Sequence, residues 1–217
     1  MENKEKDEKL FKMRHSLAHI MAAAVQRIYP DAKFGVGPAI NDGFYYDIDL
    51  GENKISEKNF GKIEKAMRRI IAEKQDFVRS EISIEEAISW AKETNQPYKL
   101  ELLNDLKNAG TTDAKILAEG DFELGNGAET VRFYTNGNYK DLCRGPHLSS
   151  TGEVGAFKLM RVAGAYWRGD EKNPQMQRLY GVAFETQEEL DKYLERMEEA
   201  IVYIIFETYQ QHTDKCI

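Results

Sequence analysis

The sequence predicts an α+β fold: a mainly antiparallel sheet packed with a long N-terminal helix, plus a smaller α/β lobe and a C-terminal helix. Two observations predict this class. Apolar residues recur at helical spacing near both ends of the chain. Segments between them alternate in polarity like strands and are joined by turn signals, Asn41-Asp42-Gly43 and Asn136-Gly137. With 217 residues and 41% hydrophobic content, the chain can bury a core.

The first predicted element is a helix at residues 10–29, where large apolar residues recur every three or four positions. Pro30 ends this helix, because proline cannot continue its hydrogen bonding. His15 and His19 lie within it, four residues apart. Both imidazole rings are therefore expected to point to one side of the helix.

Two strands are predicted next, at residues 33–40 and 44–50. Gly35 and Gly37 are unusual inside a strand, and they predict a bulge or a close approach by another part of the protein. In the second strand, Tyr45 is expected to face the side of the sheet opposite to its aromatic neighbours.

The remaining elements are predicted from the same periodicities and from local capping signals. Ser83 and Glu86 form a capping box, which predicts the start of a helix. Residues 111–129 are mixed in polarity and are predicted to form a surface excursion with a short hairpin. Helices are expected at 56–74, 83–94, 100–108 and 187–209, and strands at 77–82, 130–134, 138–142, 157–167 and 177–184.

These elements divide the chain into two parts. Residues 1–186 are expected to form one domain, into which a small lobe of helices and strands at about 52–105 is inserted. Residues 187–217 are expected to form a C-terminal helix or linker.

Composition limits the classes of function. The net charge of −7 argues against broad, nonspecific nucleic-acid binding, although a local basic rim could still hold the end of an RNA. Cys143 and Cys216 are too few for a disulfide framework, which favours a reducing, cytoplasmic setting. Residues 1–9 are almost wholly charged or polar and predict no signal peptide. The longest apolar run, 200–206, is too short to cross a membrane, so no membrane partner is expected.

The strongest functional signal is the segment 141–147, with sequence DLCRGPH, which combines a carboxylate, a thiol, a guanidinium and an imidazole. Its Gly-Pro pair excludes a regular helix, so these side chains are expected to converge from a turn. Their predicted partners are His15 and His19, in the segment HSLAH. Three of the four histidines and one of the two cysteines lie in these two segments, and this concentration indicates a functional site.

Several chemistries fit this set. His15, His19, Cys143 and His147 could form a zinc tetrad, because Cys-x3-His and His-x3-His are plausible ligand spacings. Without a metal, the imidazoles could hold or pass a proton. Cys143 could also be a covalent nucleophile with His147 as its base. The plainer alternative is that the two helical histidines are ordinary, partly buried residues.

Other charged side chains also allow two interpretations. Asp141 could orient a histidine or a lysine and Arg144 could hold a phosphate, or each could form a surface salt bridge. Basic residues surround the aromatic segment 164–169, as a stacked nucleotide end would require, but a core strand with a polar rim would have the same composition. These basic residues are Lys158, Arg161, Arg168, Lys172 and Arg178.

Seven segments occur in a characteristic order: HSLAH at 15–19, GPAI at 37–40, GFYYD at 43–47, YK at 98–99, DLCRGPH at 141–147, FKL at 157–159 and AGAYWRGD at 163–170. In this order they resemble the editing domain of bacterial threonyl-tRNA synthetase. The resemblance extends over about residues 12–199, and its two long segments are very specific.

The resemblance implies hydrolysis of serine wrongly attached to threonine tRNA, with the acceptor end of tRNA(Thr) as partner and no ligase active site in this chain. Serine and threonine differ by one methyl group, worth roughly 1–3 kcal/mol, so one binding site cannot separate them well enough. No cofactor is expected, although the related alanyl-tRNA editing proteins bind zinc through a similar set of residues. A full-length synthetase is a second candidate partner.

The resemblance also implies roles by position. Lys99 and His147 resemble the groups that orient or activate the attacking water, and His15 resembles the group beside the leaving ribose oxygen. These three are the expected catalytic residues. The expected substrate-binding residues are His19, Tyr46, Asp141, Cys143 and Arg144.

The chain departs from the family pattern in several places. The small domain that usually precedes and the aminoacylation body that usually follows are absent from it, residues 107–130 are longer than usual, and residues 201–217 do not resemble the usual polar linker. The chain is therefore interpreted as either a fragment or a free-standing editing protein. Two further alternatives are a zinc-dependent deacylase of the alanyl-tRNA editing type and a non-catalytic module that binds the tRNA acceptor end.

Overall fold

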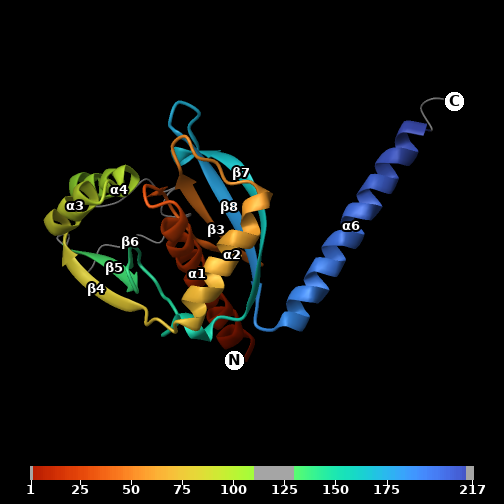
Figure 1. Ribbon diagram of the computed structural model, residues 1–217, viewed down its shortest axis with the longest axis horizontal. Helices are drawn as coiled ribbons and strands as arrows, with labels where there is room; N and C mark the ends of the chain where they lie inside the picture. Colours follow the sequence, from red (N-terminus) through yellow and green to blue (C-terminus); the bar gives the residue numbers. More distant parts are fainter. Residues whose placement is uncertain (1, 110–129, 214–217) are drawn as a thin grey trace.

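The computed structural model describes residues 2–109 and 130–213 and confirms the predicted α+β class (Figure 1). It contains a five-stranded sheet and a three-stranded sheet, and every strand pairing in both is antiparallel. The excursion predicted at 111–129 lies outside the described residues. Three short 3-10 helices connect larger elements, at Glu57–Asn59, Thr151–Glu153 and Trp167–Gly169.

Helix α1 (Glu2–Ile28) lies against the larger sheet and begins earlier than the predicted residue 10. The middle of its apolar stripe is buried, with Leu17, Ile20 and Met21 inaccessible to solvent. Helix α2 (Phe60–Ala72) packs beside α1 and buries Ile63, Met67 and Ile70. The two helices together cover the inner face of the larger sheet (Figure 1).

The larger sheet has the order β1–β3–β8–β7, and β2 also pairs with β3. On the central strand β3, Phe44 and Tyr46 belong to the core beneath α1. Tyr45 lies outside that core and its ring contacts Tyr180, as the alternation of side chains predicted. The strands are β1 (Lys33–Phe34), β2 (Ala39–Ile40), β3 (Gly43–Asp49), β7 (Ala156–Tyr166) and β8 (Gln175–Phe184).

The prediction of one continuous strand at 33–40 is wrong, because β1 and β2 are separate. A Cβ atom on Gly37 would lie 2.2 Å from Cδ2 of Tyr46, so the backbone presses directly against that ring. Pro38 follows and has no N–H to donate to a sheet ladder. The close approach predicted from the glycines is thereby confirmed, and it is the physical reason why the strand is interrupted.

The smaller sheet has the order β4–β5–β6, comprising Val78–Ser83, Thr130–Asn136 and Tyr139–Leu142. Helices α3 (Ile84–Glu93) and α4 (Pro97–Ala109) accompany this sheet. The capping box predicted at Ser83 is confirmed, since its Oγ accepts the N–H of Glu86 at 3.2 Å. Helix α4 begins at Pro97, not at residue 100 as predicted, because proline suits the first helical position. Lys99 consequently lies in the first turn of this helix.

The buried apolar residues form two clusters. The first is built on α1, α2 and the larger sheet, and the second on α3, α4 and the smaller sheet. Residues 52–105 contribute to both clusters, since Ile63 belongs to the first and Leu102 to the second. The inserted lobe and the division at residue 186 stay predictions as domains.

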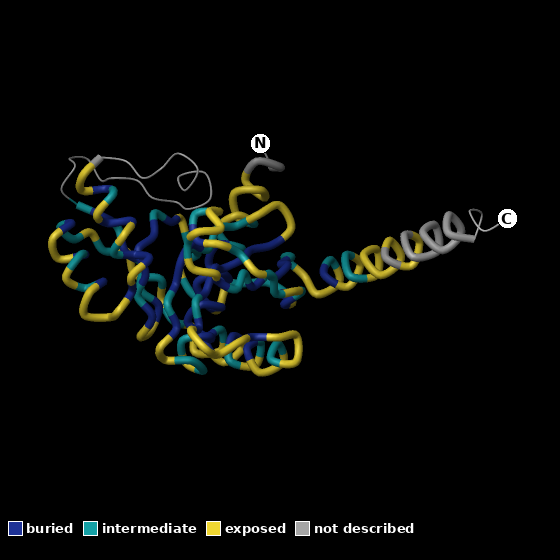
Figure 2. The backbone as a smooth tube through the Cα atoms, turned by 90° about the horizontal axis from the view of Figure 1, so that it is seen from above, coloured by how far each residue is buried: buried dark blue, intermediate teal, exposed yellow. Residues whose placement is uncertain are grey.

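Helix α6 (Gln187–Thr213) leaves the end of β8 and projects away from the rest of the molecule (Figures 1 and 2). Leu190 near its start is buried, whereas Val202 and Tyr203 are exposed. In the described part of the chain, no helix has both the length and the apolar character that crossing a lipid bilayer requires.

Candidate active site

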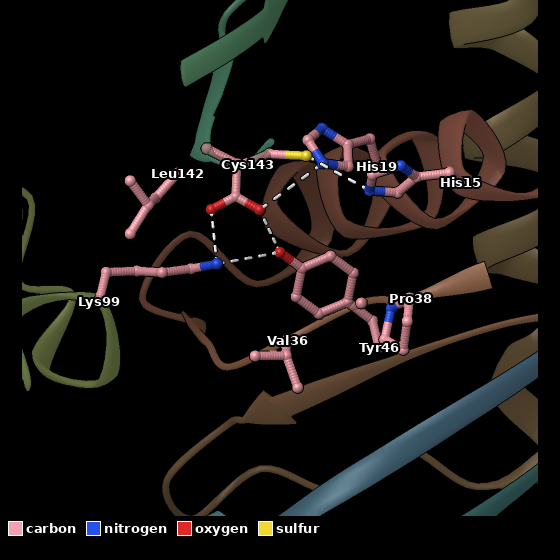
Figure 3. A pocket seen from close by; sticks show the side chains of 10 residues that line it. His15, His19, Val36, Pro38, Tyr46, Lys99, Leu142 and Cys143 are labelled. Carbon is pink, nitrogen blue, oxygen red and sulfur yellow. Dashed lines mark hydrogen bonds and ion pairs between the residues drawn. The ribbon is translucent and has the colours of Figure 1, made fainter. Parts of the chain in front are cut away.

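The two segments singled out in the sequence meet in space. His15 and His19 lie one turn apart on α1, and residues 143–148 pass in front of them without regular structure. The ring centroid of His147 lies 4.2 Å from that of His15 and 4.2 Å from that of His19. The predicted convergence of a helical histidine pair with a distant turn is thus confirmed (Figure 3).

Cys143 lies at the centre of this cluster. Its Sγ is 3.3 Å from Nε2 of His15 and 3.3 Å from Nε2 of His147. The backbone N–H of Gly145 also donates to this sulfur at 3.3 Å. Gly145 has a φ of 79°, which favours glycine and lets the chain turn back toward the sulfur.

The ring of His147 is held on several sides. Phe77 stacks on it with centroids 4.9 Å apart and planes 7° apart, and Tyr134 packs edge-on at 4.5 Å. On α1, Oγ of Ser16 lies 3.2 Å from Nδ1 of His147. These contacts fix both the position and the rotation of the imidazole.

A buried polar network lies on the other side of the pocket. Lys99 Nζ is 2.7 Å from Oδ1 of Asp141 and donates to the hydroxyl of Tyr46 at 3.3 Å. The hydroxyl of Tyr46 in turn donates to Oδ2 of Asp141, and Tyr139 donates to the same oxygen at 3.3 Å. Nε2 of His19 lies 3.9 Å from this carboxylate and so links the network to the histidine cluster.

Burial and charge determine how these groups are ionised. Burial lowers the pKa of His19 to about 3, although Asp141 opposes the shift. Burial, aided by the two other histidines, holds the pKa of His147 well below its usual value. For Asp141, burial alone would raise the pKa, but the charge of Lys99, the adjacent His19 and the hydrogen bonds from Lys99 and Tyr46 together lower it. At neutral pH the site therefore contains a carboxylate beside neutral His19 and His147.

The two tyrosines of the network remain neutral as well. Burial, followed by the charge of Asp141, raises the pKa of both Tyr46 and Tyr139 well above the usual value. Each phenol can therefore act as a hydrogen-bond donor to Asp141, which keeps the carboxylate oriented.

The pocket between these groups is partly open to solvent, and its inner part is small, about 20 Å³, which is room for about one water molecule. Polar side chains form one wall, and the segment 36–38 forms another (Figure 3). The lining residues are His15, His19, Val36, Gly37, Pro38, Tyr46, Lys99, Asp141, Leu142 and Cys143.

Most of the predicted site residues are brought together here. Six of the eight line the pocket, and His147 adjoins the lining through Cys143. Arg144 follows Cys143 on the same turn and is half-buried, but it is not among the side chains that line this pocket in the described part of the chain. Its predicted substrate contact stays a prediction.

The basic and aromatic segment around residues 164–169 has a structural explanation. Trp167 is buried and donates its indole N–H to Glu101 at 3.0 Å. Arg168 forms ion pairs with Glu101 and Asp105 on α4. These contacts support the interpretation of this segment as a core strand end with a polar rim.

Sequence reasoning missed four residues that position the site: Ser16, Phe77, Tyr134 and Tyr139. Each lies within a predicted helix or strand or directly beside one, and none carries a pattern of its own. Only Ser16 had an available signal, since it stands inside the segment HSLAH, one residue after His15.

The residues present fit a zinc ion in type. One donor atom from each of His15, His19, Cys143 and His147 lies within 4.8 Å of the others. Donors of a tetrahedral zinc site are about 3.3–3.8 Å apart, so a modest contraction would form one. Nδ1 of His19 is buried and has no hydrogen-bond partner among the described residues. A bound zinc could supply an activated water only if one of these four donors left a coordination position open.

Comparison with known proteins assigns a class to this arrangement. Residues 131–180 match the model of the second additional domain of threonyl and alanyl tRNA synthetases. The fold and site therefore define an accessory domain of the kind found in tRNA synthetases.

The individual relatives narrow this class. The threonine–tRNA ligases of Acetivibrio thermocellus, Desulfosudis oleivorans and Thermotoga petrophila are 49%, 46% and 48% identical to this chain over 187, 188 and 189 residues. The alignments cover 86%, 87% and 86% of this chain but only 26% of each relative, so the chain spans about a quarter of their length. The chain matches the editing domain of threonyl-tRNA synthetase, as the resemblance predicted.

Proposed function

We propose that this chain hydrolyses the ester bond of seryl-tRNA(Thr), as part or as a relative of a threonyl-tRNA synthetase. The match to the synthetase domain supports a role in tRNA-synthetase editing. The single observation that carries the finer proposal is the convergence of His15, His147 and the Lys99–Asp141 pair on one small pocket.

The reaction needs a water, an electrophilic carbonyl and a protonated leaving group. The water oxygen forms a bond to the ester carbonyl carbon, and the bond from that carbon to the ribose oxygen then breaks. Lys99 and His147 orient the water and the carbonyl, while His15 accepts a proton from the water as it attacks and passes this proton to the ribose oxygen as that oxygen leaves. Free serine and the deacylated tRNA end are the products.

The pocket also offers a basis for selecting serine. Asp141 and Tyr46 can hydrogen-bond the amino and hydroxyl groups of a seryl ester. The segment 36–38 closes the opposite side, and Gly37 is already in contact with the ring of Tyr46. A rigid wall of this kind disfavours the additional methyl group of threonine. An editing site must exclude the larger, correct amino acid in this way while it admits the smaller one.

The direct test incubates the pure chain with seryl- and threonyl-tRNA(Thr) and follows the loss of each ester. We expect loss of the serine ester only, and we expect His147→Ala to abolish it. Ser89→Ala is the matched control, because Ser89 is exposed on α3. Equal stability of both esters would refute the proposal, and acceptor-end binding without turnover would favour a non-catalytic module instead.

The second candidate is a zinc-dependent deacylase for a different aminoacyl ester, which the four convergent donor atoms favour. Metal analysis of the purified protein separates the two candidates. Stoichiometric zinc that is lost in Cys143→Ala would support the zinc enzyme.

A further inference from the structure

Ser16 lies inside the segment HSLAH but has no role among those that the sequence predicted. It lies on α1 between the two pocket histidines and is completely inaccessible to solvent. Its Oγ is 3.2 Å from Nδ1 of His147 and accepts the backbone N–H of Leu148 at 3.0 Å. One hydroxyl thus contacts both His147 and the residue that follows it.

The protons and lone pairs of the Ser16 hydroxyl determine which partner donates in its hydrogen bond with His147. A serine hydroxyl has one proton and two lone pairs. The N–H of Leu148 uses one lone pair, because a backbone amide can only donate. In the part of the chain that the structure describes, Oγ of Ser16 has these two partners and no third. The hydroxyl proton can therefore be satisfied only by Nδ1 of His147.

This direction determines the tautomer of the imidazole. A neutral imidazole carries one ring proton, and its other nitrogen is an acceptor. If Nδ1 accepts from Ser16, the ring proton is on Nε2. That nitrogen faces Sγ of Cys143 at 3.3 Å, so it presents an N–H toward the sulfur and the pocket.

We propose that Ser16 is a positioning residue that holds His147 in the Nε2–H tautomer, so that His147 acts in the pocket as a hydrogen-bond donor. This inference rests on the proposed editing function for its catalytic consequence. His147 then orients the water or polarises the ester carbonyl by donation, and it does not take the proton from the water. The opposite tautomer would expose a lone pair at Nε2, as a general base or a zinc ligand requires.

The tautomer can be measured without any activity. Long-range proton–nitrogen correlation spectra of the full chain with 15N-labelled histidine distinguish protonated from unprotonated ring nitrogens, and His147→Gln assigns the signals. We expect a protonated Nε2 and an unprotonated Nδ1 at His147 in the wild-type protein at neutral pH. Ser16→Ala should remove this preference, Ser16→Thr should keep it because the hydroxyl is retained, and Ser89→Ala should change nothing.

Deacylation gives the second readout. We expect Ser16→Ala to lower kcat for seryl-tRNA(Thr) by about 10- to 100-fold with KM nearly unchanged, as for other groups that orient a histidine. Ser16→Thr should restore most of this loss, and urea unfolding verifies that each variant is folded.

The possible outcomes separate the inference from the proposed function. A wild-type His147 protonated on Nδ1, or a tautomer unaffected by Ser16→Ala, overturns the inference even if deacylation is observed. The expected tautomer in a protein that hydrolyses neither ester supports the role of Ser16 and refutes the editing function.

Discussion

The ammonium group of Lys99 lies 2.7 Å from a carboxylate oxygen of Asp141, with the two side chains only 2% and 4% exposed. Lys99 comes from the first turn of α4, and Asp141 comes from β6 in the smaller sheet. Two charges buried this deeply are stable only as a pair, because each would otherwise lack compensation for its lost hydration. This pair therefore couples the stability of the protein to the geometry of its pocket.

Removing one member of this pair should destabilise the fold strongly. We expect Lys99→Met to lower the free energy of unfolding by about 3–5 kcal/mol, since Asp141 would remain buried without its partner. Urea denaturation measures the change. Lys107→Met is the matched control on the same helix, because Lys107 is about half exposed in its pair with Glu85 and should have little effect.

The double variant Lys99→Met/Asp141→Asn tests the cause. If the loss arises from an unpaired buried charge, the double variant should be more stable than Lys99→Met alone. A double variant that is less stable than either single variant would contradict this explanation.

The stability of the protein should fall on mild acidification. His19 has a pKa of about 3 in the folded protein against about 6.5 when unfolded, so between these values the unfolded state binds a proton that the folded state does not. Each such histidine removes at most about 1.4 kcal/mol of unfolding free energy per pH unit. The pKa of His147 is lowered in the same direction.

Unfolding free energies measured from about pH 6.5 to about pH 4 test this expectation. We expect His19→Gln to have a smaller slope than the wild type over this range. The contribution of Asp141 does not interfere, because its lowered pKa confines its effect to more acidic conditions. Equal slopes for the two proteins would show that His19 does not titrate as its burial requires.

The contact between Gly37 and Tyr46 should make this glycine intolerant of any side chain. A Cβ at residue 37 would lie 2.2 Å from the ring, so Gly37→Ala must displace either the ring or the backbone. We expect a loss of about 1–3 kcal/mol in unfolding free energy, together with loss of deacylation as Tyr46 moves away from Asp141.

Gly61→Ala is the matched control for this substitution. Gly61 lies in α2 with no atom within 4 Å of its hypothetical Cβ. Alanine there should stabilise the protein by about 0.5–1 kcal/mol, because glycine is unfavourable inside a helix. A lower unfolding free energy for Gly61→Ala, or an unchanged one for Gly37→Ala, would contradict the packing described.

Removal of metal distinguishes the two candidate chemistries. If His147 carries its proton on Nε2, it cannot offer that nitrogen to zinc without reversing the hydrogen bond with Ser16 and leaving the Ser16 hydroxyl proton without an acceptor among the described residues. We therefore expect deacylation of seryl-tRNA(Thr) to persist after treatment with a chelator, and added zinc to inhibit or leave the rate unchanged. A rate that disappears on chelation and returns with zinc would instead support the metal-dependent enzyme.

The sequence by itself determined the fold class and the two segments of the site. Hydrophobic periodicity and turn signals are local, so they predicted α1, the antiparallel strands and the capping box at Ser83. Histidine and cysteine are rare in this sequence, so their concentration in the segments HSLAH and DLCRGPH predicted a site. The order of the other motifs resembles the editing domain, and that resemblance predicted Lys99 as a site residue.

Only the tertiary structure decided which side chains complete the pocket. Ser16, Phe77 and Tyr139 act through contacts with residues far away in the chain, and no local pattern records such contacts. The interruption at Gly37 depends in the same way on a ring from the neighbouring strand. Burial is a property of the folded molecule, so the neutral histidines and the paired charges of Lys99 and Asp141 arise only once the two parts of the chain have packed together.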